Sequence, residues 1–495
     1  MAWFPDGVAV GLRSRAAFAL SDVEDSEFPS CRARVGIDAR RGWANPQPPR
    51  QPFSDTLIAA IRNVVEALAA GRPVDPDGGL ARAAKTYTGF HAAIREFLDT
   101  ATLNYLEFLE AREQIVGPLA YIGYSFFRNV DGDMSMKLWA PVYETETKAR
   151  EVHRLRYSRA QTIKTEWSSG AAWIVSDSRY SVSVLEVGIG DASKALVLDA
   201  AGVQEIADSH DRESLPRLTA IAAGTKPISG SDCLRCVAVS VCPVPIPMHI
   251  FPGMRDEIPW VRALSETDLL RYGTCPAKAF IKSHHLPAKG GTSEAANRGI
   301  RVHRWIADTH ESPLSCADAL LVGGTEAEDD LPYLKAHASV CDRAGLTSLG
   351  SEQTLVGWDA QIGDVIFMKP DELWMLDNDM LVLREIKTTT NSAALDSDIA
   401  WQQFSDVVTW WLVVLRGGLV QHFGATRGQV ELEVLTPEGA AVHILSLDDP
   451  NLDFRIAGWA LGIPSMWLSD RDLHPNPGAH CEQCEVIKWC RAGQS

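Results

Sequence analysis

The 495-residue sequence has no apolar run close to the ~20 residues that a membrane-spanning helix needs. Its start, MAWFPDGVAVGLRSR, lacks a basic region followed by an apolar core, so no secretory signal is expected. Both absences favour a cytoplasmic protein that does not bind a membrane. In that reducing compartment, cysteines are expected to be metal ligands or core residues rather than disulfide partners.

Positive charge is also scarce, because 47 Lys and Arg face 64 Asp and Glu and leave a net charge of −17. This balance argues against general coating of nucleic acid, although a local basic groove would suffice for phosphate contacts. No G-x-x-x-x-G-K-[ST] loop is present, so the chain has no helicase motor of its own. With 46% hydrophobic and 22% charged residues, the composition is typical of a globular protein.

The order of the segments predicts an α/β protein with more than one domain. Helical periodicity covers 55–70 and 88–116, and strand-like runs cover 429–436 and 440–447. The Pro-rich stretch 246–262 interrupts these patterns and is interpreted as a linker. The predicted domains are therefore 1–245 and 263–495.

Cysteine spacing reveals an internal repeat. A C-x2-C-x5-C triplet occurs twice, and each triplet has a solitary cysteine roughly 200 residues upstream, with a similar pair of predicted strands just before the triplet. The two sets are Cys31 with Cys233, Cys236 and Cys242, and Cys275 with Cys481, Cys484 and Cys490. This arrangement favours an ancient duplication of one domain plan.

Four thiolates around one centre suit a structural zinc ion or an iron–sulfur cluster. A ligand that lies far upstream fits a cluster that joins the two ends of a domain, so a [4Fe-4S] cluster is favoured over zinc for the second set. The repeat implies a possible second cluster at the first set. Cys316 and Cys341 fall outside the scheme and are interpreted as ordinary core or surface thiols.

The stretch GDVIFMKPDELWMLDNDMLVLREIKTTT (363–390) carries the chemistry. Its two apolar runs place Asp371 near the start of one strand and Glu385 and Lys387 on the next. Because side chains alternate along a strand, Glu385 and Lys387 share a face and Ile386 points the other way. Two carboxylates can hold a divalent cation that activates water, and the lysine can orient the nucleophile or stabilise the transition state. This combination suits metal-assisted phosphodiester hydrolysis.

The second half, from Leu264 to Arg491, resembles the RecB-like, iron–sulfur-containing branch of the PD-(D/E)XK nucleases. The segments that carry the resemblance occur in family order: LLRYGTCPAKAFI, GIRVH, KPDELW, REIKT, WQQFSDVVTWW and the final cysteine triplet. The resemblance implies tandem restriction-endonuclease-like folds with a degenerate N-terminal copy.

The resemblance also assigns roles to single residues. It makes His303 a metal ligand beside Asp371 and Glu385, with the main-chain carbonyl of Ile386 as a further ligand. Gln402 or Gln403 would be the glutamine of the family's Q-x-x-x-Y helix, whose tyrosine is absent here. Cys275 and the final cysteine triplet would hold the iron–sulfur cluster.

The implied function is Mg²⁺- or Mn²⁺-dependent hydrolysis of DNA, of the exonuclease or flap type, on single-stranded or free ends. DNA repair, recombination or phage defence would be the setting, alone or with a separate helicase or defence partner. The alternatives are a non-catalytic DNA-binding scaffold with two nuclease-like folds and a zinc-stabilised interaction protein.

In the first half, Asp133 with Glu146 and Lys148 has nearly the spacing of Asp371 with Glu385 and Lys387. However, Pro141 interrupts the candidate strand, and no histidine occurs near position 59. The first copy is therefore expected to be degenerate and to serve stability or DNA binding.

Overall fold

The chain forms two compact units in the computed structural model. Unit 1 comprises Met1–Val244, Cys275–Lys289 and Asp472–Ser495, and unit 2 comprises Pro245–Thr274 and Gly290–Arg471. The structure describes residues 16–19, 31, 61–67, 69–70, 92–131, 134–156, 165–223, 227–230, 233, 236, 238–250, 264–283, 286–288, 294–323, 328–343, 345–376, 379–460, 462–470, 472–490 and 492. The contiguous domains expected from the sequence differ from this division in the placement of 275–289 and 472–495.

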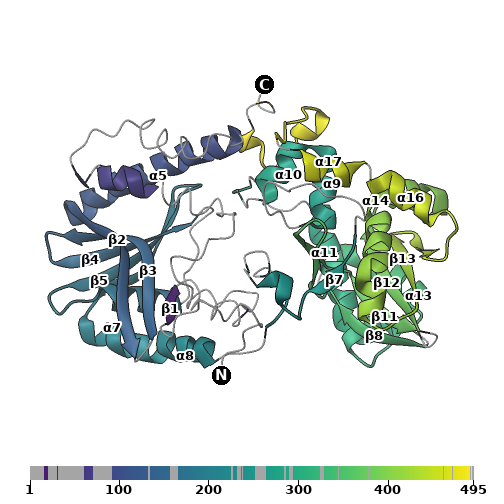
Figure 1. The fold of residues 1–495 in the computed structure, drawn as a ribbon, viewed down its shortest axis with the longest axis horizontal. Coiled ribbons are helices and arrows are strands. Elements are labelled where there is room, and N and C mark those ends of the chain that lie inside the picture. The colour runs from purple at the N-terminus through teal and green to yellow at the C-terminus, as the bar shows by residue number, and fades with distance from the viewer. Residues whose placement is uncertain are drawn as a thin grey trace. The chain divides into compact units, whose positions relative to one another are not determined.

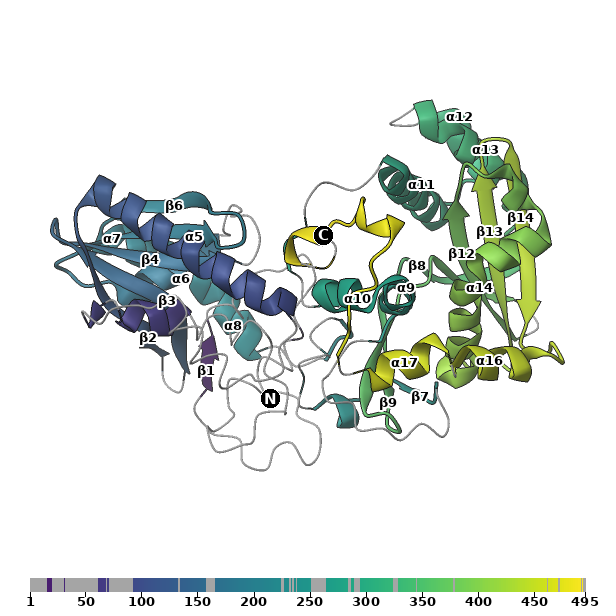
Figure 2. The ribbon, with the colours of Figure 1, turned by 90° about the horizontal axis from the view of Figure 1, so that it is seen from above.

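Unit 1 is built on a six-stranded mixed sheet. Its order is β1-β3-β4-β5-β6, and β2 pairs with β3. The strands are β1 (Ala16–Ala19), β2 (Leu119–Asp131), β3 (Met134–Thr145), β4 (Ala149–Arg156), β5 (Ser181–Gly188) and β6 (Ser193–Ala201). The helices of this unit include α5 (Ala92–Val116), α6 (Thr165–Val175), α7 (Val203–Ser209), α8 (Leu215–Ala223) and α10 (Pro276–Ser283). Figure 2 shows α5 running across the sheet.

The alternation of side chains along β3 and β4 separates two faces of this sheet. Val142 and Val152 pack with α6 in an apolar core. The next residues in sequence, Tyr143 and His153, point to the opposite face and contact Tyr105 of α5. The period of two along each strand therefore gives unit 1 one apolar face and one face with buried polar groups.

Unit 2 contains a five-stranded mixed sheet of order β14-β13-β12-β11-β8 and a three-stranded sheet of order β10-β9-β7. The strands are β7 (Ile246–Met248), β8 (Leu346–Ser351), β9 (Leu355–Asp359), β10 (Asp364–Met368), β11 (Glu372–Leu376), β12 (Met380–Thr388), β13 (Arg427–Thr436) and β14 (Gly439–Ser446). Helices flank the larger sheet (Figure 1). The helices that contact this sheet are α11 (Glu294–Glu311), α13 (Leu331–Val340) and α14 (Ser397–Val414). The other helices of the unit are α9 (Glu266–Thr274), α12 (Cys316–Gly323), α15 (Val420–His422), α16 (Leu452–Ala460) and α17 (Ile463–Ser469).

The predicted linker 246–262 overlaps β7, which pairs in parallel with β9. Residues 251–262 of that linker lie outside the described residues. None of the helices in the described part of the chain is long and apolar enough to cross a membrane.

The two larger sheets repeat one strand plan. In unit 1, β2-β3-β4-β5-β6 pair in the sequence antiparallel, antiparallel, parallel, antiparallel. In unit 2, β8-β11-β12-β13-β14 pair in the same sequence of directions. The predicted α/β class, with mixed sheets flanked by helices, is confirmed, and the shared strand order is what a duplication would produce.

A shared turn aligns the two copies residue by residue. Lys148, before β4, and Asp379, before β12, both have left-handed backbone conformations, with φ of 59° and 60°. Each donates its main-chain N–H to the last residue of the preceding strand, Thr145 at 3.2 Å and Leu376 at 3.1 Å. Residues at equal distances from this turn therefore correspond in the two copies, so that β3 is matched to β11 and β4 to β12.

The two cysteine triplets also share their local backbone structure. The main-chain N–H of Cys233 bonds Gly230, and that of Cys481 bonds Gly478. The main-chain N–H of Cys236 then bonds the carbonyl of Cys233, and that of Cys484 bonds the carbonyl of Cys481. The repeat read from cysteine spacing thus has the same turn geometry in both copies.

Candidate functional site

Three elements of unit 2 bring charged side chains together at one place. Asp371 immediately precedes β11, while Glu385 and Lys387 lie on β12. His303 comes from α11, and its Nδ1 lies 3.1 Å from Asp371 Oδ1. The alternation predicted for 385–387 is observed, because Ile386 packs into the apolar core with α11 and α13.

Asp371 is held on both of its carboxylate oxygens. Oδ1 faces His303, and Oδ2 accepts the main-chain N–H of Ile386 at 2.6 Å. Burial alone would raise the pKa of Asp371, but the charge of His303 and the hydrogen bond between them outweigh burial and lower it. Asp371 is therefore an ionised carboxylate in a fixed orientation.

Glu385 lies deeper, with 4% of its surface exposed. Trp411 of α14 donates its indole N–H to Oε2 at 2.8 Å, and Lys387 forms an ion pair with Oε1. Burial, followed by repulsion from Asp371, raises the pKa of Glu385 to about 8. The positive charge of Lys387 is therefore not enough to offset the effect of burial on this carboxylate.

Lys387 and His303 supply the positive charge of the cluster. Burial would lower the pKa of Lys387, but Glu385 and Glu266 raise it above its ordinary value. Burial would also lower the pKa of His303, whereas Asp371 and then Glu352 raise it to about 10. Both side chains are therefore charged, and a cation bound at this cluster would replace the proton on His303.

Two carboxylates of this cluster were not predicted from the sequence. Glu352 Oε1 lies 3.5 Å from His303 Nδ1, and His303, Glu352 and Asp371 could together hold a metal ion. Glu266 of α9 contributes to the electrostatics of Glu385 and Lys387. In the structure, Glu352 has a left-handed φ of 51°, a conformation that glutamate rarely adopts.

The donor set fits a hard divalent cation. Asp371, Glu352 and Glu385 offer carboxylate oxygens, which Mg²⁺ and Mn²⁺ prefer. Burial, and then repulsion from Asp371 and Glu266, raises the pKa of Glu385, and a divalent cation would stabilise its ionised form. The predicted carbonyl ligand, Ile386, is adjacent to both Glu385 and Lys387 on β12.

Gln402 and Gln403 lie on α14, as expected for a glutamine-bearing helix. No hydrogen bond or ion pair among the described residues joins either glutamine to the cluster. The same helix contributes Trp411 instead, through its contact with Glu385. The DNA-positioning role of the glutamines stays a prediction.

The N-terminal copy carries different residues at the equivalent positions. Counted from the shared turn, Ala140, Arg154 and Arg156 correspond to Asp371, Glu385 and Lys387. Arg154 lies over the Trp167 ring of α6 at 4.8 Å, and Arg156 pairs with the buried Glu186. Carboxylates are thus replaced by alanine and arginine, and this copy cannot hold a cation in the same way.

The sequence spacing had matched Asp133, Glu146 and Lys148 of this copy to the charged residues of unit 2, and that match was wrong. Glu146 and Lys148 lie in the turn between β3 and β4 rather than on a strand. Asp133 lies outside the described residues. The similar spacing that suggested these residues was counted along the chain, whereas the shared turn fixes the register of the strands.

The second cysteine set comes together in unit 1. Its four members line one pocket of about 320 Å³, a volume that includes space open to solvent. Cys275 Sγ accepts a main-chain N–H from Asn476, and Cys481 Sγ accepts one from Gly478, both at 3.5 Å. The pocket is lined by Cys275, Cys481, Cys484 and Cys490 among other residues. Four thiols around one pocket are a donor set that fits an iron–sulfur cluster or a thiolate-bound metal.

The first cysteine set is partly brought together as well. Burial raises the pKa of the Cys242 thiol, and Cys31 adds to that effect, so these two side chains are close enough to interact. Cys233 is buried, and Cys236 is partly buried. In each set the solitary upstream cysteine thus interacts with one cysteine of the triplet, Cys31 with Cys242 and Cys275 with Cys484.

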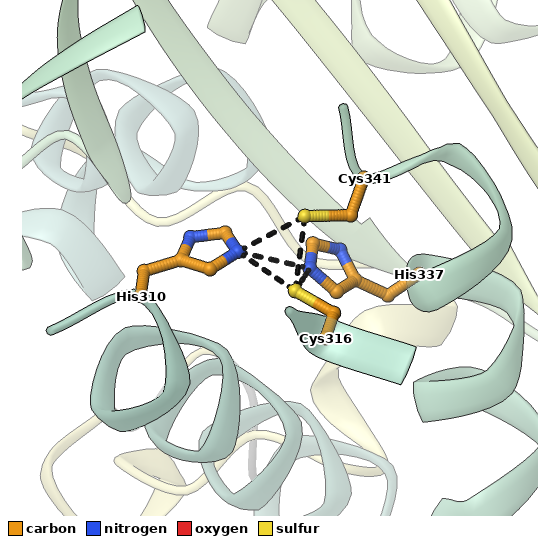
Figure 3. Close-up of side chains that lie close together, drawn as sticks. All are labelled: His310, Cys316, His337 and Cys341. Carbon is orange, nitrogen blue, oxygen red and sulfur yellow. Dashed lines mark hydrogen bonds between the residues drawn. The ribbon is translucent and has the colours of Figure 1, made fainter. Parts of the chain in front are cut away.

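A third donor cluster was missed by the sequence analysis. Two histidines and two cysteines of unit 2 point toward a common centre, and together they could hold a metal ion (Figure 3). They are His310, Cys316, His337 and Cys341. Cys316 and Cys341, interpreted from the sequence as ordinary core or surface thiols, are the two sulfur donors of this cluster. The H-x5-C and H-x3-C spacings could have signalled the site, but neither matches a C-x2-C turn.

Comparisons with known proteins add little. No family model matches the sequence, and no curated protein matches it. A crystal structure described as a "Putative exonuclease" from Eubacterium rectale is 13% identical and has a TM-score of 0.31, over 46% of this chain and 88% of that chain. The crystal structure of SSO0001 is 17% identical, with a TM-score of 0.24, over 49% and 90% of the two chains. TM-scores this low do not establish a common fold, so function has to be argued from the site.

Proposed function

We propose that unit 2 is a metal-dependent deoxyribonuclease of the RecB-like PD-(D/E)XK type, which hydrolyses DNA phosphodiester bonds. The observation that carries the proposal is the convergence of Asp371, Glu385 and Lys387 with His303. Two carboxylates, an imidazole and an ammonium group at the ends of neighbouring strands form a set that suits metal-assisted phosphoryl chemistry.

Each residue has a distinct role in this proposal. Asp371, Glu385 and His303 hold Mg²⁺ or Mn²⁺, together with the main-chain carbonyl of Ile386. When bound, the cation supplies Lewis-acid activation of water and offsets charge at phosphorus. Lys387 keeps its proton, so its ammonium group orients the attacking water and stabilises negative charge on the phosphate oxygens.

Neighbouring groups fix these residues in place. Trp411 orients Glu385 through its indole N–H, and the Ile386 amide orients Asp371. Hydrolysis adds the water oxygen to phosphorus, breaks one P–O ester bond, and leaves a phosphate end and a hydroxyl end. Gln402 or Gln403 would position the DNA strand.

Substrate and setting follow from the family resemblance. Single-stranded or free DNA ends are the proposed substrates, cut in an exonuclease or flap mode. DNA repair, recombination or phage defence is the proposed process, with a separate helicase or defence partner where strand separation is needed. Unit 1 would be the non-catalytic copy, because Ala140 and Arg154 stand where unit 2 has Asp371 and Glu385.

We further infer that Cys275, Cys481, Cys484 and Cys490 hold a [4Fe-4S] cluster, with zinc as the alternative. One zinc ion would draw four sulfurs to about 3.8 Å from one another. These thiols line one pocket of about 320 Å³, which is large for a single ion. In a [4Fe-4S] cluster each thiolate binds a different iron atom, so four thiols around one pocket suit such a cluster.

The test is cleavage of labelled single- and double-stranded DNA by purified protein with Mn²⁺. Lys387→Ala should lower kcat by roughly 100- to 1000-fold, as loss of a transition-state donor does elsewhere. Lys335→Ala, an exposed lysine of α13, is the matched control and should cleave like the wild type. No cleavage by the wild type, or equal cleavage by Lys387→Ala, would favour the scaffold alternative.

A further inference from the structure

We propose that His310, Cys316, His337 and Cys341 form a tetrahedral structural zinc site in unit 2. The proposal is independent of the nuclease assignment and of the iron–sulfur cluster, because it rests on a separate set of donor atoms. Zinc is bound in this way by two thiolates and two neutral imidazoles in closed structural sites.

The distances between donor atoms match such a site. His310 Nε2 lies 3.2 Å from both Cys316 Sγ and Cys341 Sγ, and 3.3 Å from His337 Nε2. Cys316 Sγ lies 3.5 Å from His337 Nε2. Ligands at zinc bond lengths in a tetrahedron are about 3.3 to 3.8 Å apart. The distances that involve ring nitrogens therefore lie within a few tenths of an ångström of the spacing that one ion would impose, whereas the two sulfurs are closer together than that spacing.

The two sulfurs are not joined to each other. Cys316 Sγ and Cys341 Sγ are 3.0 Å apart, whereas a disulfide bond is about 2.05 Å long. Two unbonded thiols this close, beside two ring nitrogens, are explained by a shared partner at the centre. Figure 3 shows all four side chains directed toward that centre.

The second ring nitrogen of each histidine is fixed by a carboxylate. His310 Nδ1 pairs with Glu372 Oε1, and His337 Nδ1 lies 2.6 Å from Glu433 Oε1. Both imidazole side chains are fully buried. In metal sites, a carboxylate on the far nitrogen sets the tautomer and directs the near nitrogen to the ion. This arrangement distinguishes the cluster from histidines that merely fill a core.

Arg384 of β12 holds the supporting carboxylates. It lies 3.6 Å from Glu433 and 4.0 Å from Glu372, and it donates to Glu431 at 2.7 Å. The cation and its two thiolates would be neutral overall. The arginine therefore offsets part of the remaining negative charge of the carboxylates, which makes the buried network tolerable.

The site also explains how a poorly packed helix is retained. Leu321 and Val322 of α12 are 86% and 78% exposed, so this helix contributes little apolar burial. Cys316 is its first residue and is buried. A metal bound by residues at the end of α11, the start of α12 and the end of α13 would join three helices that share only a small core.

The proposal is tested by zinc and iron analysis of the purified full-length chain. Wild type should contain one zinc ion per chain more than Cys316→Ser, and Cys316→His should keep that ion. Iron content should be the same in both variants as in the wild type. Cys484→Ser should lose iron, or a second zinc ion if the second cysteine set holds zinc, and should keep the ion bound by Cys316. Equal zinc in wild type and Cys316→Ser, or loss of iron from Cys316→Ser, would overturn the assignment.

A measurement on the wild type covers the case in which Cys316→Ser does not fold. Cys316 and Cys341 should resist alkylation in the purified protein and react after a chelator has removed zinc, as mapped by mass spectrometry. Cobalt added to the chelated protein should give the visible absorption of a tetrahedral cobalt–thiolate site. Rapid alkylation before chelation, or a disulfide between the two cysteines, would rule the site out.

Discussion

Arg154 of β4 and Glu385 of β12 occupy the same position in two sheets of identical strand order, and their charges are opposite. Glu385 faces Lys387 and Trp411, whereas Arg154 lies over the ring of Trp167. The helix that follows each strand thus contacts the residue in both copies, through a hydrogen bond in one and a cation–π contact in the other. The two sheets share one strand plan, but the position of the proposed cation ligand Glu385 carries a positive charge in unit 1.

The contact between Trp411 and Glu385 can be tested separately from the catalytic residues. Trp411→Phe removes an N–H bond to a buried carboxylate, a change that costs about 1.5–3 kcal/mol. If part of that cost falls on the transition state, cleavage should slow by roughly 10-fold. Trp410→Phe is the control, because Trp410 is equally buried and its indole nitrogen bonds none of the described residues. Equal rates for the two variants would contradict the role given to Trp411.

Unit 1 should depend on a buried ion pair beneath α5. Arg112 binds Glu151 with its Nε and terminal nitrogen, at 2.7 to 3.1 Å, and Glu151 is 2% exposed. Arg112→Ala leaves this buried carboxylate with His153 Nε2 at 3.3 Å but without its permanently charged partner, and should lower the free energy of unfolding by about 3 kcal/mol. Chemical denaturation measures the loss.

The control for that ion pair is a surface pair of the same unit. Arg62 lies 3.8 Å from Glu66, and both side chains are nearly half exposed. Arg62→Ala should therefore change the free energy of unfolding by about 1 kcal/mol or less. A comparable loss in both variants would argue against a special role for the buried pair.

His210 should make unit 1 less stable in mild acid. Burial, assisted by Arg128, lowers the pKa of His210, which stacks on Trp173 with ring centroids 4.1 Å apart. Its contribution to stability is fully present above the unfolded pKa of about 6.5 and is lost as the pH falls toward the lower folded pKa. The free energy of unfolding should drop by up to about 1.4 kcal/mol per pH unit in that window.

His210→Phe keeps the aromatic stack and removes this titration. Hydrogen exchange of the β5 amides between pH 7 and 5 should show a smaller pH dependence than the wild type. His474→Phe, at a side chain that is 83% exposed, should leave the dependence unchanged. The prediction fails if His210→Phe and the wild type lose stability in parallel.

The two cysteine sets allow a matched comparison of iron content. Cys484→Ser should lose the cluster proposed for the second set, together with the brown colour and the broad absorbance near ~400 nm. Cys236→Ser is the equivalent change in the first set and should remove iron only if that set also holds a cluster. Iron that is unaffected by Cys484→Ser would refute the cluster at the second set.

The sequence was most informative where chemistry is local. Alternation along one strand was enough to place Glu385 and Lys387 on a face opposite Ile386, and the structure has that arrangement. Turn spacing also revealed the two cysteine triplets. Both patterns depend only on residues that are near one another in the chain, so periodicity and spacing record them directly.

Contacts between residues far apart in the sequence could not be predicted from periodicity or spacing. Glu266 and Glu352 approach the charged cluster around Asp371 and Glu385 from a helix and a loop, and nothing in their local sequence marks them. The histidine–cysteine cluster draws ligands from three helices, and its carboxylate partners come from β11 and β13. The register of the N-terminal copy was also missed, because it depends on the conformation of Lys148 rather than on residue count.

The pleat of β12 has a consequence for how this region can change. Glu385 and Arg384 are neighbours in sequence, yet one faces Trp411 and the proposed cation site and the other faces the carboxylates beside the histidine–cysteine cluster. Adding or deleting one residue within the strand would exchange these faces and disable both centres at once. Substitutions in β12 can be tested one by one, but insertions and deletions should be tolerated only outside the strand. The length of β12 is therefore more tightly constrained than its composition.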